Sequence, residues 1–439
     1  MMKKVFSVVA ISCSTLFFAQ NNKREKLINY LDSLFVHHKV MGSFAMATQD
    51  QPNFVKSVGF ADVDTKQKAN MNTQYRIGSI SKTFTAVLVM KAIEDNKLKL
   101  SSTLSEFYPE LTNAKSITIE NLLQHRSGIH NLTDEKEYWD YNTLPQTESS
   151  LITIIKKYPS DFAPGTKFEY SNSNYILLGF ILEKIYKKSY AELIQDKISK
   201  PLKLKLTKVG GRIDTSKNQA KSYVFEINNY VKWHETDMSI PIGAGNLIST
   251  PSELLTFIIA LENGKLVSKE SLSQMKNFVD GYGLGITKVP FGKYWGYGHN
   301  GGIDQFLSTL YYFPELKAGI SFITNQSDYD NNQISINMLS VASNQDFEMP
   351  DFNVFQVEAA LLKQYEGTYK ADGFPLDINI VAENGVLKAQ ATGQGQFSLT
   401  AISNTEFKFD TAHIKMKFDA EKKTMDFSQG SHQYVFKKQ

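Results

Sequence analysis

Apolar positions recur at strand-like and helix-like spacings in separate blocks of the chain. Residues 43–48 and 54–60 predict two strands of a hairpin, because turn-forming residues separate them. Helices are expected at 23–38, over much of 117–202 and at 332–343, and later strands at 294–299, 305–313 and 319–324. Early and late strands around a helical insert indicate an α/β (α+β) domain with a mostly antiparallel sheet and a helical subdomain.

The pattern changes after residue 343. Residues 344–354 contain three acids and Pro350 without a clear period, which predicts a linker. Between 355 and 439 apolar and polar residues alternate over several short stretches, and Asn384-Gly385 is a strong hairpin-turn pair. The chain is therefore expected to contain a first domain over 23–343 and a small all-β barrel over 355–439.

Residues 1–19 have the form of a secretory signal peptide. Lys3 and Lys4 precede an apolar run that ends at Phe18, and Ala19 is the expected cleavage site. Two alternatives are a retained membrane anchor and lipoprotein processing before Cys13. We expect a secreted, periplasmic protein that meets the membrane only through its export signal.

Length and composition limit the number of domains and the classes of function. A length of 439 residues favours two domains over one. The net charge of +3 is small, and no basic run interleaved with aromatic residues indicates a nucleic-acid groove. Cys13 is the only cysteine, and the eight histidines show no metal-binding spacing. We therefore expect no metal and no other cofactor.

Ser79 and Lys82 are the first candidates for chemistry. They begin a segment whose apolar run predicts a helix, and Ser81 and Thr83 can cap its start. Residues three apart share a helix face, so the lysine amine can reach the Ser79 hydroxyl. A partly buried lysine can lose its proton near neutral pH and activate the serine, while helix-start N–H groups face an oxyanion. The alternative is an N-capped helix with a solvated lysine.

Tyr170 and Asn172 form a second candidate group. A polar loop carries them to the start of an apolar helix over 176–185. We expect a neighbouring lysine ammonium to lower the pKa of Tyr170, so that the phenol can shuttle protons. The Asn172 amide can hold both a substrate carbonyl and the lysine. The alternative is an ordinary Asn/Ser helix cap.

His299, Gly301 and Gly302 form the third group. They end a strand that begins near Trp295. Two glycines let the backbone approach a ligand closely, so their N–H groups can complete an oxyanion hole opposite Ser79. The alternative is a glycine-rich bulge.

In this order, the three groups resemble the S-x-x-K, Y-x-N and K-T-G or H-x-G motifs of the serine penicillin-recognising enzymes. That group includes class C β-lactamases, low-molecular-weight D,D-peptidases and β-lactamase-fold esterases. Residues 122–128 and 243–250 are similar to two further stretches of the family, although Arg126 replaces a threonine. The resemblance covers roughly 23–343 and implies a β-lactamase/D,D-peptidase-like fold.

The resemblance also implies roles for the candidate residues. Ser79 corresponds to the acylated nucleophile and Lys82 to its base, with Tyr170 protonating the leaving group. Asn172 corresponds to a holder of the substrate amide, and the backbone N–H groups of Ser79 and Gly302 to the oxyanion hole. His299 and Gly301 correspond to substrate-binding positions. Because free histidine titrates near pH 6.5, His299 is expected to bind a substrate carboxylate better at pH 6 than at pH 8.

These roles predict an exported serine hydrolase that works through an acyl-enzyme. Its substrate is expected to be a small molecule or peptide with an ester, amide or β-lactam carbonyl. A D,D-peptidase or muropeptide-type activity is preferred, and hydrolysis of small esters and class C-like β-lactamase activity are alternatives. A penicillin-binding sensor with residual catalysis is the non-enzyme alternative.

Other features are open to more than one interpretation. His125 is interpreted as structural, and Arg126 as a solvated residue unless it reaches the cleft rim. The aromatic run 137–141 fits either a cleft wall or a buried helix edge. The last domain resembles the small lipocalin-like β-domains appended to such hydrolases, where a packing or spacer role is expected before ligand binding.

Overall fold

A computed structural model describes residues 22–49, 51–352, 355–383, 385–393, 395–409, 412, 414–430 and 432–439. Its contacts divide the chain into one unit that reaches Ser327 and includes Ser335–Phe347, and a second made of Asp328–Ile334 and Glu348–Gln439. The expected signal peptide with Cys13, residues 353–354 of the expected linker, and Asn384 lie outside the described residues. Among the described residues, no helix has the length and apolarity needed to span a bilayer.

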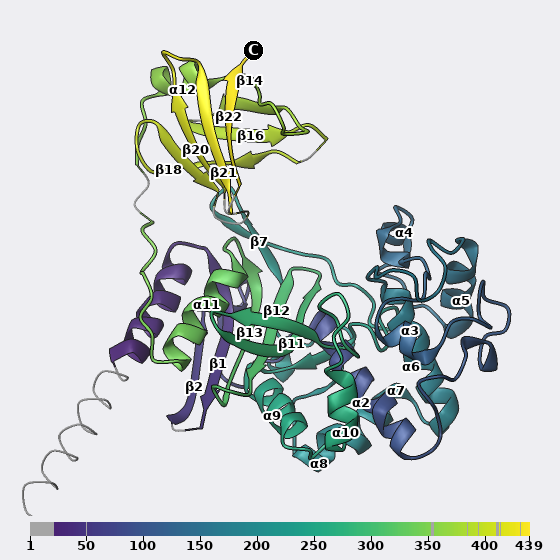
Figure 1. Ribbon diagram of the computed structural model, residues 1–439. Helices are drawn as coiled ribbons and strands as arrows, with labels where there is room; N and C mark the ends of the chain where they lie inside the picture. Colours follow the sequence, from purple (N-terminus) through teal and green to yellow (C-terminus); the bar gives the residue numbers. More distant parts are fainter. Residues whose placement is uncertain are drawn as a thin grey trace, which may run out of the picture. The chain divides into compact units, whose positions relative to one another are not determined.

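An antiparallel sheet forms the centre of the first unit (Figure 1). Its order is β10-β11-β12-β13-β1-β2, so the strands from the start of the chain pair with those from its end. The bounds are β1 Val40–Thr48, β2 Gln51–Val58, β10 Thr287–Phe291, β11 Tyr294–Ile303, β12 Phe306–Phe313 and β13 Ala318–Ser327. This arrangement confirms the predicted mixed α/β fold, although β10 was not expected.

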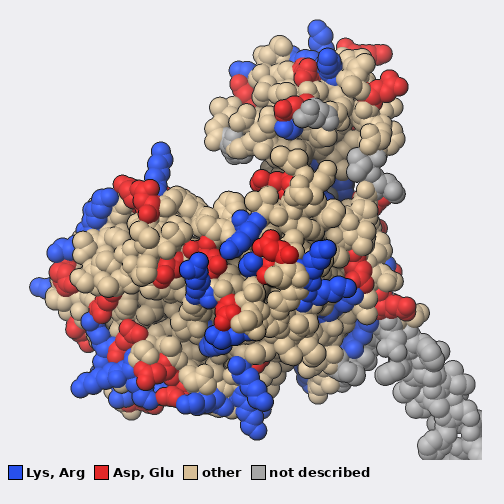
Figure 2. All heavy atoms as spheres, turned by 180° about the vertical axis from the view of Figure 1, so that it is seen from behind, with Lys and Arg blue, Asp and Glu red and all other residues tan. Residues whose placement is uncertain are grey.

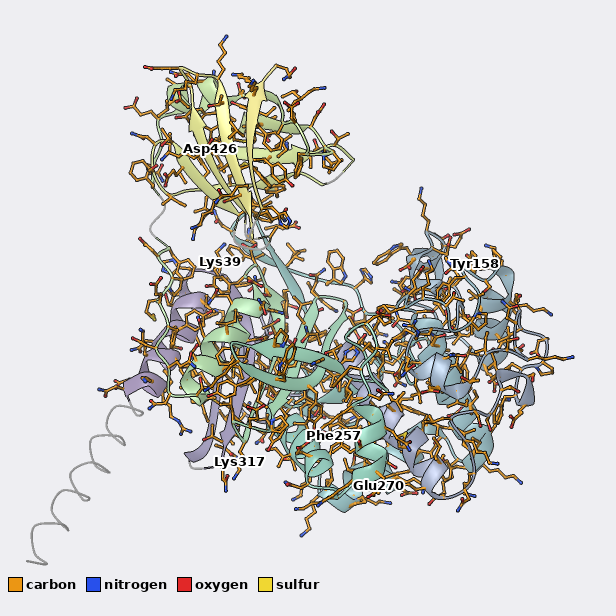
Figure 3. All side chains as sticks on the ribbon, viewed as in Figure 1. Lys39, Tyr158, Phe257, Glu270, Lys317 and Asp426 are labelled. Atoms are coloured by element: carbon orange, nitrogen blue, oxygen red, sulfur yellow. The ribbon has the colours of Figure 1, made fainter. Side chains whose placement is uncertain are left out.

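Helices cover the sheet of the first unit. Residues 22–36 are helical, and α11 (Asn331–Ala342) follows β13. Helix α9 (Pro251–Glu262) packs on β1, β12 and β13. Its Phe257, labelled in Figure 3, stacks on Phe84 with ring centroids 3.7 Å apart. This contact joins the sheet's helical cover to the helix that follows Ser79.

Helix α2 (Ser81–Glu94) is buried around almost its whole circumference. The sequence predicted an apolar face and side-chain caps at Ser81 and Thr83, and the prediction of caps is wrong. The Ser81 hydroxyl accepts a hydrogen bond from the Leu247 backbone N–H, and the Thr83 hydroxyl donates to the Gly285 carbonyl. Both hydroxyls therefore attach a central helix to distant segments of the chain.

The predicted helical subdomain is confirmed between the two sets of strands. Its helices are α3 Ile119–Leu123, α4 Tyr138–Tyr141, α5 Glu148–Lys157, α6 Asn172–Tyr186, α7 Tyr190–Ile194 and α8 Lys200–Leu202. Thr118, Thr147 and Ser189 cap three of them with side-chain hydrogen bonds. The chain then returns through β9 (Leu247–Ser249), which pairs with β5 (Tyr75–Arg76) just before Ser79.

Charge is spread rather than concentrated on the face shown in Figure 2. Acidic and basic side chains are interspersed there over the first unit. This distribution agrees with the small net charge of +3.

The second unit contains helix α12 (Ala359–Tyr365) and a nine-stranded sheet. The sheet's two edge strands, β17 (Phe397–Ser398) and β18 (Thr400–Ala401), are separated in the chain by Leu399 alone, so the sheet nearly closes on itself. Its other strands are β14 Gly367–Lys370, β15 Ile378–Glu383, β16 Val386–Ala391, β19 Glu406–Phe409, β20 Ile414–Asp419, β21 Thr424–Gln429 and β22 His432–Lys438. This confirms the predicted small all-β barrel, whose interior is filled by apolar side chains.

Candidate active site

Ser79 lies in a single 3₁₀ turn, η1 (Gly78–Ile80), directly before α2. Gly78 has φ +48°, and a Cβ placed on it would lie 2.8 Å from the Gly302 backbone nitrogen. A Cβ on Gly301 would lie 2.1 Å from the Ile77 carbonyl oxygen. Both positions need glycine, because the Ser79 turn and β11 are in backbone contact.

Lys82 is fully buried beside Ser79. Its Nζ lies 3.0 Å from Ser79 Oγ, 2.7 Å from Asn172 Oδ1 and 2.8 Å from the Ala244 carbonyl oxygen. Burial lowers the pKa of Lys82 well below its usual value. The solvated lysine of the alternative interpretation is therefore wrong.

The three neighbours of Lys82 also determine where the N–H groups and the lone pair of its neutral amine point. Asn172 Oδ1 and the Ala244 carbonyl can only accept hydrogen bonds. A neutral amine has two N–H groups and one lone pair. If the two N–H groups satisfy these acceptors, the lone pair is directed at the Ser79 hydroxyl, which is the arrangement a general base needs.

Tyr170 contacts the same serine. Its hydroxyl hydrogen-bonds Ser79, and its ring centroid lies 4.9 Å from Lys82 Nζ. The expected lowering of the Tyr170 pKa is wrong. Burial raises that pKa above its ordinary value and outweighs the opposing effect of the hydrogen bond with Ser79. The phenol is therefore protonated at neutral pH and is available as a proton donor.

Asn172 is the first residue of α6, and Ser171 occupies the cap position without a side-chain capping bond. The Asn172 backbone N–H donates to Asn131 Oδ1 at 2.9 Å, and its Nδ2 donates to Thr133 Oγ1 at 3.0 Å. These bonds leave the Asn172 Oδ1 atom to accept a hydrogen bond from Lys82. The segment therefore does more than cap a helix, because it positions the amide against the lysine.

His299 is buried, and both of its ring nitrogens hydrogen-bond other groups of the protein. Nε2 lies 3.0 Å from the Tyr282 hydroxyl, and Nδ1 contacts the Asn300 carbonyl. Burial and the positive charge of Lys82 lower the His299 pKa to about 4, despite the opposing bond to Asn300. The expectation that His299 changes charge between pH 6 and 8 and then binds carboxylates is wrong.

His125 is fully buried, in agreement with its structural interpretation. Its Nδ1 accepts the Ser171 backbone N–H at 3.1 Å, and its ring lies 4.2 Å from that of Tyr170. Arg126 does not line the active-site pocket. Its guanidinium pairs with Asp280 at 2.5 Å and also donates to the Gly165 carbonyl.

A pocket of 350 Å³ opens at the serine. Ser79, Asn172 and Gly302 line it, together with an aromatic wall of Tyr138, Trp139, Trp233 and His234. Trp139 is 61% exposed, and its ring packs edge-on against His234 at 5.8 Å. Of the two interpretations of run 137–141, the structure therefore supports the cleft wall.

A larger cavity of 860 Å³ lies at Tyr190 and Arg212. None of Ser79, Lys82, Tyr170 and Asn172 is among the described residues that line it. We assign the smaller pocket to the chemistry, because it contains the serine.

Four groups that hydrogen-bond the candidate site residues were not predicted from the sequence. They are the Ala244 carbonyl, Asn131, Thr133 and Tyr282. Ala244 lies in the stretch 243–250 that resembled the family, so that match was a usable signal. The other three are single polar residues, two of them in or next to the 3₁₀ turn η3 (Leu132–Asp134), and no local pattern marks them.

Metal ligation has no structural candidate in the described part of the chain. No group of three or more His, Cys, Asp and Glu side chains there is arranged to hold an ion.

The two buried histidines predict a loss of stability in acid. The pKa of His299 is about 4 and that of His125 is well below 6.5, so the unfolded chain binds protons that the folded protein does not. The free energy of unfolding should therefore fall as pH drops from about 6.5 to about 4, by up to about 3 kcal/mol for His299. Urea unfolding at pH 7.5, 6 and 5, followed by tryptophan fluorescence, measures this, because all three tryptophans lie in the first unit.

A matched pair of variants tests the assignment. His299→Asn should flatten the dependence on pH, whereas His37→Asn, at an exposed position, should leave it unchanged. His130 acts in the opposite sense. Hydrogen bonds to Asp161 and Glu135 raise its pKa despite partial burial, so its contribution is lost as pH rises. Equal slopes in wild type and His299→Asn would contradict the prediction.

The site can be compared with known proteins. A family model described as Beta-lactamase matches residues 29–342. The chain is 27% identical over 281 residues to the teichoic acid D-alanine hydrolase of Staphylococcus aureus, a match that spans 63% of this chain and 68% of that protein.

Three solved structures extend the comparison. D-amino acid amidase from Ochrobactrum anthropi SV3 has 24% identity and a TM-score of 0.65, over 74% of this chain and 99% of that one. D-stereospecific amidohydrolase from Streptomyces sp. has 25% identity and a TM-score of 0.62, over 72% and 97%. The octameric penicillin-binding protein homologue from Pyrococcus abyssi has 23% identity and a TM-score of 0.68, over 94% and 99%.

Proposed function

Because the chain belongs to the β-lactamase family, we propose that it is an exported serine hydrolase that forms an acyl-enzyme at Ser79. Family membership confirms the resemblance inferred from the three motifs. The relatives are themselves hydrolases, which agrees with the prediction that this chain is a hydrolase of the β-lactamase fold. Export is supported by the sequence pattern of residues 1–19.

One observation carries the proposal. A fully buried lysine lies 3.0 Å from the hydroxyl of a partly exposed serine, and two pure acceptors occupy its other hydrogen-bonding positions. Burial favours the neutral amine, and the geometry directs its lone pair at the serine. A structural lysine has no need of this arrangement.

The chemical steps follow from these positions. Lys82 takes the Ser79 proton as Oγ bonds to the substrate carbonyl carbon, and the negative charge moves to the carbonyl oxygen. The backbone N–H groups of Ser79 and Gly302 stabilise that charge. Tyr170 donates a proton to the leaving oxygen or nitrogen as its bond to carbon breaks, and Lys82 returns a proton to Tyr170. Water then attacks the acyl-enzyme in the same way and releases Ser79.

The charge of the pocket points to the substrate class. Among the described residues that line it, none is lysine or arginine, and the one carboxylate, Asp304, is buried against Arg76 at 2.8 Å. His299 has no free ring nitrogen, and Arg126 is paired elsewhere. Within the described part of the chain, no lysine or arginine lines the pocket to hold the free carboxylate of a D-Ala-D-Ala peptide or a β-lactam.

We therefore propose a D-aminoacyl ester or amide as substrate, with a departing group that carries no carboxylate. The names of the relatives, a D-alanine hydrolase and D-amino acid amidohydrolases, agree with this class. The neutral ester or amide alternative thus gains support over the D,D-peptidase that the sequence analysis preferred.

A pair of substrates tests this choice. We expect kcat/KM for a peptide ending in D-Ala-D-Ala to stay the same or rise when its C-terminal carboxylate is converted to an amide. We also expect D-alanyl p-nitroanilide to be hydrolysed at least about 10-fold faster than its L counterpart. A free acid preferred about 10-fold or more over the amide would instead indicate a D,D-peptidase, since a carboxylate contact is worth about that much.

A further inference from the structure

Tyr282 connects two buried histidines behind the active site. Its hydroxyl lies 3.2 Å from His125 Nε2 and 3.0 Å from His299 Nε2, and all three side chains are buried. The three residues come from separate segments, since Tyr282 lies in the loop between α10 (Lys269–Met275) and β10. No motif in the sequence includes it.

The protons in this chain of contacts can point in only one direction. The Ser171 backbone N–H is an obligate donor at 3.1 Å, so His125 Nδ1 accepts, and neutral His125 carries its proton on Nε2. At the other end, the Asn300 carbonyl can only accept, so His299 Nδ1 carries the proton there. His125 therefore donates to the Tyr282 oxygen, and Tyr282 donates to His299 Nε2.

The two ends of the chain of hydrogen bonds lie on opposite sides of the reacting centre. Ser171 is between Tyr170 and Asn172, which contact Ser79 and Lys82. Asn300 precedes Gly301 and Gly302, the strand segment that closes on the Ser79 turn. Tyr282 is thus the central link between the proton donor and one side of the oxyanion hole.

We propose that Tyr282 is a positioning residue for the hydrolysis proposed above, which holds the Tyr170–Asn172 loop and the Gly301–Gly302 strand in register through His125 and His299. It has no role in bond making. Its hydroxyl accepts a hydrogen bond from His125 Nε2 and donates one to His299 Nε2, and so joins the two rings. The other ionisable groups near these residues are Lys82, Tyr170 and Tyr175. The Tyr175 hydroxyl donates to the Leu123 carbonyl at 2.8 Å, and its oxygen is a second acceptor for the Tyr282 hydroxyl.

Removal of this hydroxyl should impair catalysis more than binding. In Tyr282→Phe, both histidines lose a buried partner, and the two sides of the site can shift. We expect kcat for a D-alanyl ester to fall about 10- to 100-fold, as displacements near 1 Å do, with KM changed less than about 3-fold. Tyr190→Phe is the matched control, because Tyr190 is equally buried and its hydroxyl bonds only Thr85 Oγ1, at 2.7 Å, among the described residues.

Two further readouts separate positioning from a general loss of stability. Imidazole ¹⁵N NMR of the wild type should show His125 protonated on Nε2 and His299 on Nδ1, without titration between pH 5.5 and 8. In Tyr282→Phe, both rings should stay neutral, because burial still lowers the His299 pKa, but the ¹⁵N shift of His299 Nε2 should change when its hydrogen-bond donor is lost. His299→Gln keeps one donor and one acceptor and should retain most of the activity, whereas His299→Met should lose about as much as Tyr282→Phe.

Three outcomes would overturn the inference. They are a kcat within about 2-fold of wild type in Tyr282→Phe, an equal loss in Tyr190→Phe, and equal activity of His299→Gln and His299→Met. Ser79→Ala is measured with the same substrate. If that variant remains active, the proposed function fails, whereas an inactive Ser79→Ala beside a normal Tyr282→Phe refutes only the role of Tyr282.

Discussion

Replacing Ser79 with alanine should lower kcat/KM for ester and amide substrates by about 10⁴-fold or more. Removal of the nucleophile eliminates the covalent route and leaves only stabilisation by the oxyanion hole and binding. The hydroxyl lies 3.0 Å from Lys82 Nζ and contacts Tyr170, so both proton-transfer partners converge on this atom. Wild-type protein treated with a fluorophosphonate should gain one adduct, and peptide mapping should place it on Ser79.

Ser81 and Ser171 are the informative comparisons for that experiment. The Ser81 hydroxyl is buried and accepts the Leu247 N–H, and the Ser171 hydroxyl donates to the His130 carbonyl at 3.3 Å. Neither hydroxyl hydrogen-bonds a basic side chain among the described residues. Ser79→Ala should retain the circular dichroism of the wild type and gain no adduct. An adduct at Ser81 or Ser171, or a variant with wild-type turnover, would refute the assignment.

Lys82→Met should lower kcat by about 10²- to 10⁴-fold, with a smaller change in KM, as expected when a general base is lost. Because burial keeps the pKa of Lys82 well below its usual value, the wild type should be active at neutral pH. Its kcat/KM should decline as pH falls through that pKa and the amine becomes protonated. A pH–rate profile of wild type and variant between pH 5 and 9 tests both statements.

Lys91 provides the matched control on the same helix. It lies nine residues further along α2, where it is only partly buried, and Lys91→Met should preserve kcat and the acid limb. A Lys82→Met variant that keeps near-normal kcat across this range would indicate that Tyr170 is the base. That outcome would also conflict with the raised pKa of the Tyr170 phenol.

Much of the architecture could be predicted from local pattern. Alternation and turn residues predicted most strands of both sheets, and the three-residue spacing of Ser79 and Lys82 implied their contact, since helix geometry is the same in any sequence. The resemblance of the three motifs correctly indicated the family. The strand β10 and the short strands around β9 were missed, because they are brief and pair with residues far away in the chain.

The protonation states of the site were decided by tertiary structure alone. Burial lowers the pKa of Lys82, and the groups packed against its amine include Ala244 and Asn172, which are 162 and 90 residues away in the chain. His299 and Tyr170 differ from expectation for the same reason, since burial disfavours whichever form is charged. The sequence by itself determined which residues are present and which lie one helical turn apart. Only the fold determined their solvent exposure and their distant partners, because desolvation depends on every segment packed around a group.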